Sequence, residues 1–140
     1  MTVPALLLAA GGVFAQTYPS KTVRFIVPYA PGGSSDVLAR TLGQKLGAAF
    51  GQTFVIDNRP GAGNNIGTEI AARATPDGYT VFLVNPANAI NATLYTKLPF
   101  NFLQDLAPVG GMVRVPNVME VTNSLPAKTI SEFIANAKAN

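Results

Sequence analysis

The stretch from residue 23 to residue 46, VRFIVPYAPGGSSDVLARTLGQKL, decides the fold class of this chain. An apolar, β-branched run over residues 22–29 predicts a buried strand, which a Pro-Gly-Gly turn then breaks. A helix is predicted over 34–50, because apolar residues recur at about every fourth position and Gly51 follows. We expect that helix to pack through one apolar face, made of Val37, Leu38, Leu42, Leu46 and Ala49.

The same alternation continues along the chain. Short apolar runs predict strands at 53–57 and 80–85, and NIGTEIAARA predicts a helix at 65–74 between them. Links this short favour parallel neighbours with right-handed crossovers. The sequence therefore predicts an α/β fold with a doubly wound parallel sheet.

Beyond residue 85 the pattern loosens. A short helix and a loop are expected first, and residues 107–122 then read as one extended path with a break near Pro116. A last helix is predicted with its cap at Thr129 or Lys128, and Glu132 lies three residues after Thr129, as in a capping box. Because nothing closes the sheet at this point, we expect the chain to be the front part of a longer protein.

The composition excludes several classes of function. Apolar residues are 48% and charged residues 12%, so the chain can bury a core. The net charge of +3 comes without a basic run, which argues against a nucleic-acid partner. The chain contains neither cysteine nor histidine, so the common nucleophile pairs and metal-ligand sets are missing. We expect no cofactor, no metal site and no catalytic residues.

The N-terminal residues resemble an export signal. Residues 3–10 form an apolar core, and Val13-Phe14-Ala15 fits a small-residue cleavage site. The apolar run is too short to span a membrane. We predict a signal peptide, clipped at its front, over residues 1–15, and a mature chain exported to the periplasm or cell exterior; the alternative is an N-terminal element of the fold.

The turn after the first strand is the leading candidate site. Ligands of open α/β sheets lie outside the carboxyl ends of the strands, and the first turn of a helix offers unpaired N–H groups to an anion. Gly32 and Gly33 would let the backbone approach a ligand, while Ser34 or Ser35 could cap the helix or donate a hydroxyl. Asp36 is expected to serve the helix dipole. A plain strand-to-helix turn is the alternative reading.

Two further loops should reach the same edge of the sheet. Asn64 or Asn65 could cap the second helix, and Asn65 could also bind a ligand. Asn85, Ala87 and Asn88 follow the third strand. No paired carboxylates for acid–base work accompany them. A site rich in backbone donors and poor in titratable groups suits holding a small anion without transforming it.

These stretches together resemble a known family. The motifs PGGSSD, NRPGAGNNIG and PDGYT, with the segment LAPVGGMVRVPNVMEVT, are similar to the substrate-binding receptors of tripartite tricarboxylate transporters, or Bug receptors, over nearly all of residues 18–140. The resemblance implies a periplasmic-binding-protein-like (type II) fold of two lobes that close on a small carboxylate or amino acid. It also implies permease subunits as partners. Its carboxylate-binding turn would comprise Gly32, Gly33, Ser34 and Ser35, and the first-lobe side of its cleft Asn65, Ala87 and Asn88.

This resemblance sets the expected organisation and function. The first lobe would span residues 16–107, and residues 108–140 would hold a strand crossing into a second lobe and the start of that lobe. The expected function is extracytoplasmic capture of a small organic acid for transport. The alternatives are a ligand-sensing module for a signalling partner and a hydrolase on the same fold.

Overall fold

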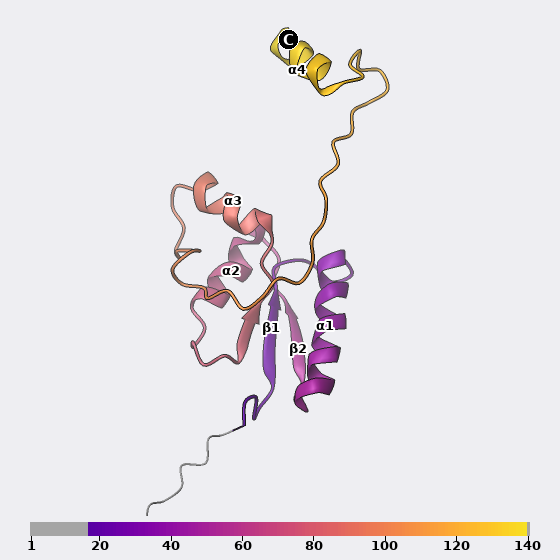
Figure 1. Cartoon of the computed structure of the whole chain (residues 1–140). Coiled ribbons are helices and arrows are strands. Elements are labelled where there is room, and N and C mark those ends of the chain that lie inside the picture. Colours follow the sequence, from indigo (N-terminus) through magenta and orange to yellow (C-terminus); the bar gives the residue numbers. More distant parts are fainter. Residues whose placement is uncertain (1–16, 140) are drawn as a thin grey trace, which may run out of the picture. The chain divides into compact units, whose positions relative to one another are not determined.

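The computed structural model describes residues 17–139, so the predicted signal peptide at 1–15 lies outside the described residues. The chain divides into two units, with the division between Pro108 and Val109. The first unit holds a sheet flanked by helices, and Figure 1 shows its strands β1 and β2 beside helix α1. Each unit is described by itself below.

The sheet of the first unit is parallel, as predicted. Its strands are β1 (Val23–Val27), β2 (Phe54–Asn58) and β3 (Thr80–Phe82), in the order β2-β1-β3. Because β1 lies between two neighbours, its side chains are buried on both faces, and Ile26 is fully inaccessible. The strands β1 and β3 are shorter at their carboxyl ends than predicted, because the residues that follow leave the ladder for the turns that build the candidate site.

The helices lie on both faces of this sheet. Helix α1 (Ser34–Phe50) joins β1 to β2, and α2 (Asn65–Ala72) joins β2 to β3 after a short 3₁₀ turn, η1 (Ala62–Asn64). A third helix, α3 (Pro86–Leu94), follows β3. Figure 1 shows α1 on one side of the strands and α2 and α3 on the other. This doubly wound arrangement confirms the predicted fold class.

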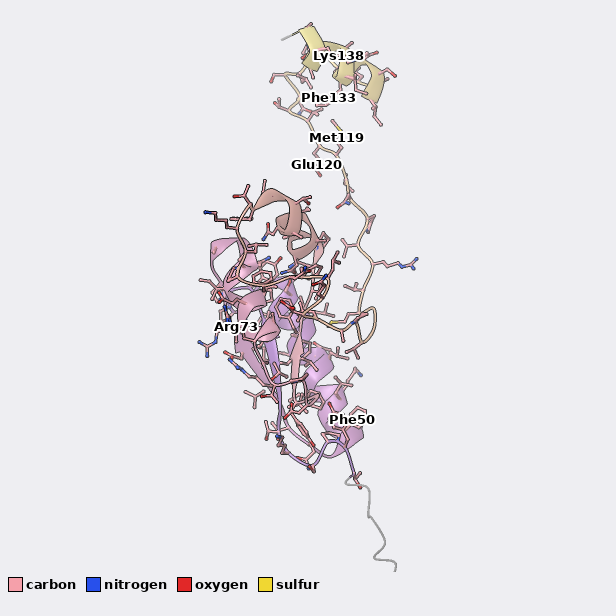
Figure 2. The ribbon with its side chains drawn as sticks, turned by 90° about the vertical axis from the view of Figure 1, so that its left-hand side faces the viewer. Phe50, Arg73, Met119, Glu120, Phe133 and Lys138 are labelled. Carbon is pink, nitrogen blue, oxygen red and sulfur yellow. The ribbon has the colours of Figure 1, made fainter. Side chains whose placement is uncertain are left out.

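The bounds of α1 agree with the prediction, and its predicted packing face agrees in part. Gly51 ends the helix in the left-handed conformation at φ 67°, where a side chain would be strained. The buried positions are Asp36, Ala39 and Gly43, with the leucines beside them half-buried. Val37 is 58% exposed, so placing it on the packing face was wrong. Ala49 is exposed as well, because the last turn of α1, including Phe50 (Figure 2), extends beyond the core.

The core of the first unit lies between the sheet and α1. It consists of Phe25, Val27, Ala39 and Leu83, and Tyr29, Leu42, Ile56 and Val81 pack against it. On the opposite face α2 comes so close to the end of β1 that a β-carbon on Gly67 would lie 2.9 Å from Pro28 Cβ. That close approach brings the start of α2 to the carboxyl edge of the sheet.

The second unit lacks the predicted crossing strand. Residues 107–122 form no strand pairing in the described part of the chain, and Met119 and Glu120 lie on this stretch (Figure 2). Its valines are largely exposed, as Val115 (76%) illustrates, because an extended segment needs a neighbouring strand to bury them. These residues form no strand by themselves, and their crossing into a second lobe stays a prediction.

The last predicted helix is present as α4 (Ile130–Ala139), with Phe133 and Lys138 on it (Figure 2). Thr129 Oγ1 accepts the amide of Glu132 at 3.2 Å, which is one half of the predicted capping box. The Glu132 carboxylate accepts the amide of Lys128 at 2.7 Å, so the returning bond reaches one residue further back than expected. Among the described helices, none combines the length and the apolar character that a membrane crossing requires.

Candidate functional site

The strand order places a crevice at the carboxyl edge of the sheet. From β1 the chain continues to β2 on one side of β1, and then to β3 on the other side. The helix after β1, α1, and the helix after β3, α3, therefore lie on opposite faces of the sheet (Figure 1). Such a switch point leaves room between the two loops, and it is where ligands bind in open α/β sheets. Tyr29 follows β1 and Asn85 follows β3, so both residues lie at this edge.

The turn after β1 borders an open hollow of about 460 Å³. The amino-terminal cap of α1 is Gly33, and no side chain makes a capping hydrogen bond there. The expectation that Ser34 or Ser35 caps the helix was therefore wrong. Within the described residues the amides of Gly33, Ser34 and Ser35 have no acceptor, so they remain available to an anion. The hollow is lined by Tyr29, Ala30, Pro31, Gly33, Ser34 and Ser35.

Asp36 holds this turn in shape. Its carboxylate accepts the amide of Gly32 at 3.0 Å, Arg40 Nε at 2.9 Å and Asn58 Nδ2 at 2.9 Å. The Arg40 bond, followed by the Gly32 and Asn58 bonds, lowers the pKa of Asp36 from 3.8 to about 2. Asp36 therefore stays ionised and fastens the turn to α1 and β2, while Gly32 adopts φ +91°, a conformation that favours glycine.

The loop after β3 is organised by asparagine side chains. Asn85 caps α3 by accepting the amide of Ala87 at 2.7 Å, and Asn88 Oδ1 accepts the amide of Asn85 at 2.9 Å. Asn88 also donates through Nδ2 to Thr68 Oγ1 of α2 at 2.8 Å. Both polar atoms of the Asn88 side chain and the amide of Ala87 are therefore already used: Asn88 Oδ1 and the Ala87 amide form the cap of α3 with Asn85, and Asn88 Nδ2 holds α3 against α2.

Asn65, the first residue of α2, is largely buried, and its one free donor is accessible, since no buried side-chain nitrogen or oxygen among the described residues lacks a partner. Its Oδ1 accepts Nδ2 of Asn91 at 2.9 Å, and the same Asn91 nitrogen donates to the carbonyl of Gly63 at 2.6 Å. Asn65 Nδ2 has no acceptor among the described residues. Of the two residues predicted as the cap of α2, Asn64 occupies the cap position, without a side-chain capping bond, and Asn65 does not.

The hydroxyl of Tyr29 joins the three loops. It accepts Nδ2 of Asn64, just before α2, at 2.8 Å, and it accepts Nδ2 of Asn85, just before α3. Tyr29 is half-buried against the core and also lines the hollow at the start of α1. Four residues organise the site: Tyr29, Asn64, Asn85 and Asn91. Asn85 was expected at this edge and Asn64 was considered only as a helix cap, whereas Tyr29 and Asn91 were missed.

The predicted site residues thus fall into two groups. Donors at Gly33, Ser34, Ser35 and Asn65 remain free, whereas polar groups of Gly32, Ala87 and Asn88 are engaged within the fold. The described residues contain no group of three acidic, histidine or cysteine side chains that could hold a metal ion.

A larger open hollow, of about 610 Å³, lies between α1 and the edge strand β2. It extends along Gly43 and Gly47 to Gly51 and Thr53, which precede β2 at the amino edge of the sheet. It borders neither the start of α1 nor the asparagine loops, so the smaller hollow fits the candidate site better.

Comparison with known proteins gives consistent matches. Residues 38–140 match the profile of the "Tripartite tricarboxylate transporter family receptor". Protein BugT of Bordetella pertussis is 37% identical over 99% of this chain and 44% of its own length. The R. palustris protein Rpa4515, solved with adipate, has a TM-score of 0.67 at 37% identity, covering 87% of this chain and 41% of that one. A structure described as a periplasmic transporter has a TM-score of 0.67 at 40% identity, covering 88% and 42%. The chain therefore spans less than half the length of these relatives.

Proposed function

The chain belongs to the tripartite tricarboxylate transporter receptor family, and we propose that it captures a small carboxylate in the periplasm for uptake. Two findings support this proposal. The family profile covers most of the chain, and the similar protein Rpa4515 was solved with adipate. The sequence-predicted signal peptide at 1–15 agrees with export.

One observation carries the assignment of the site. The amides at the start of α1 face an open hollow and have no acceptor within the described residues. The positive end of the helix dipole lies at the same place, so a carboxylate oxygen would gain several hydrogen bonds and a favourable field. We place the carboxylate at Gly33, Ser34 and Ser35, with Gly32 setting the conformation of the turn and Asn65 as a further donor.

The rest of the cleft would come from the complete receptor. We propose that residues 16–107 form its first lobe, and that residues 108–140 cross toward a second lobe and begin it. Ala87 and Asn88 would then shape the first-lobe wall of the cleft through α3. Closure of the two lobes would exclude water and strengthen the amide contacts. Membrane permease subunits are the proposed partners of the closed form.

The site suits binding without catalysis. No acidic or basic side chain lines the hollow in the part of the chain that the structure describes. Asp36, the nearest carboxylate in the sequence, is held in three hydrogen bonds and would be a weak base, because the pKa of its side chain is lowered to about 2. We therefore propose that the ligand leaves chemically unchanged.

Thermal unfolding with candidate acids tests the proposed function. The protein carrying this sequence, at its full natural length, would be screened with adipate, succinate, citrate, glutamate and nicotinate. A bound acid should raise the melting temperature, and the stabilisation should grow with the logarithm of one plus its concentration over Kd, because it binds only the folded state. Absence of a shift with all five acids, supported by titration calorimetry, would contradict capture of a small carboxylate.

The variant Gly33→Val tests the position of the carboxylate. A β-carbon at Gly33 would meet only the carbonyl of Ala30, at 4.0 Å, and its φ of −80° suits valine, so the fold should persist. The valine methyl groups would stand over the amides of Ser34 and Ser35 and should abolish the ligand-induced shift. Ala49→Val, which adds the same side chain at the exposed end of α1, is the control and should keep it. Normal binding by Gly33→Val would place the carboxylate elsewhere.

A further inference from the structure

We propose that Tyr29 is a further ligand-binding residue, whose hydroxyl donates a hydrogen bond to an oxygen of the bound carboxylate. This inference rests on the proposed function and adds a side-chain donor to a site otherwise built from backbone amides. It follows from counting the hydrogen bonds that the Tyr29 oxygen already makes.

The first of these bonds comes from Asn85, and its direction is fixed. Asn85 Oδ1 accepts the amide of Ala87 at 2.7 Å, so this end of the side chain must be the oxygen. The other end, Nδ2, can only donate, and it faces the Tyr29 hydroxyl. Tyr29 therefore acts as an acceptor toward the loop that follows β3.

The second bond comes from Asn64, whose Nδ2 lies 2.8 Å from the Tyr29 oxygen. A phenolic oxygen can accept about two hydrogen bonds and has one proton to donate. With both acceptor positions filled, only the proton remains, and no acceptor for it is found among the described residues. Since Tyr29 lines the hollow beside Gly33, Ser34 and Ser35, that hollow is where an acceptor for the proton can sit.

This arrangement selects the kind of ligand atom at this point. A carboxylate or carbonyl oxygen of the ligand can accept the hydroxyl proton of Tyr29. An ammonium group could not bind there, because the Tyr29 oxygen already accepts hydrogen bonds from Asn64 and Asn85. The asparagines thereby turn a side chain that could both donate and accept into a donor only. The hydroxyl and the free amides of the α1 start can then bind the same carboxylate group from two sides.

Titration calorimetry on the Tyr29→Phe variant measures the contribution of the hydroxyl. The titrant is the tightest-binding acid among adipate, succinate, citrate, glutamate and nicotinate, and the protein is used at its full natural length. Tyr29→Phe removes a hydrogen bond to a charged group, and the loss of such a bond should weaken the binding of the acid by about 10- to 100-fold. The control is Tyr79→Phe, which removes a phenolic hydroxyl just before β3, at the amino edge of the sheet, where it bonds Ser20. It should bind within about threefold of the wild type, because this hydroxyl lies at the edge of the sheet opposite the candidate site.

A second substitution separates donation from a purely structural role. With 3-fluorotyrosine in place of Tyr29, the more acidic hydroxyl donates more strongly and accepts more weakly. At mildly acidic pH, where the fluorinated phenol stays protonated, we expect the acid to bind a few-fold more tightly. A hydroxyl that only accepts the two asparagine bonds would give equal or weaker binding.

The outcomes distinguish this inference from the proposed function. Wild-type affinity in Tyr29→Phe, an equal loss in Tyr79→Phe, or weaker binding with 3-fluorotyrosine would overturn the role of Tyr29 while leaving carboxylate capture intact. A wild-type protein that binds none of the five acids would overturn both.

Discussion

Gly67 is the position where adding a single methyl group should most clearly damage the site's framework. It lies buried in α2, where the helix crosses the end of β1. A β-carbon there would lie 2.9 Å from the carbonyl oxygen of Arg59, 2.9 Å from Pro28 Cβ and 3.1 Å from Pro28 Cα. These are backbone and proline-ring atoms, which cannot rotate away, so Gly67→Ala must move α2 as a whole.

The expected cost follows from two opposing effects. Overpacking of a well-packed site costs about 1–3 kcal/mol, and three close contacts with rigid atoms place Gly67→Ala at the upper end. Replacing glycine by alanine in a helix returns about 1 kcal/mol. The free energy of unfolding should therefore fall by about 2 kcal/mol. The displaced α2 start would also disturb Asn64 and its bond to Tyr29.

Urea unfolding followed by circular dichroism measures this loss, with Gly43→Ala as the matched control. Gly43 is also a buried helical glycine, but the nearest atom to its added β-carbon is Ile56 Cδ1 at 3.2 Å, the end of a flexible side chain. That clash can be relieved by a small rotation, so the gain in helix propensity should roughly cancel its cost. If Gly67→Ala proved as stable as Gly43→Ala, the reasoning from close backbone approach would be refuted.

Two further predictions concern buried polar groups. Because the pKa of Asp36 is lowered from 3.8 to about 2 in the fold, its ionised form stabilises the protein above about pH 4, and this contribution is lost as the pH falls toward 2. Asp36→Asn should thus lower the urea midpoint at neutral pH, and the difference in midpoint between wild type and variant should shrink as the pH falls. A difference that stayed constant down to pH 2 would contradict this. Thr68→Val should cost about 1–3 kcal/mol in chemical unfolding, because it leaves Nδ2 of Asn88 buried without its acceptor. Thr41→Val, which removes an exposed hydroxyl from α1, is the control and should be nearly neutral; equal effects would argue against the buried pair.

Much of the fold could be predicted because its signals are local. The start of α1 follows from the Pro-Gly-Gly turn. Its end follows from Gly51, because glycine adopts the left-handed backbone found there without strain. The parallel sheet and the edge that carries the site follow from the alternation of strands and helices with short links. The buried face of α1 was predicted less well, since periodicity did not reveal that Val37 faces away from the sheet.

The sequence by itself thus determined the strand-to-helix turn, its exposed amides and the edge of the sheet at which a ligand would bind. Only the tertiary structure decided which polar groups there are free and which are used. Tyr29 meets Asn64 and Asn85 across 35 and 56 residues of chain, and Asn88 meets Thr68 across 20. No local pattern encodes such bonds, because they depend on how α2 and α3 pack against β1. That packing uses the side chain of Asn88 to join α3 to α2, and it leaves the hydroxyl of Tyr29 free only to donate its proton.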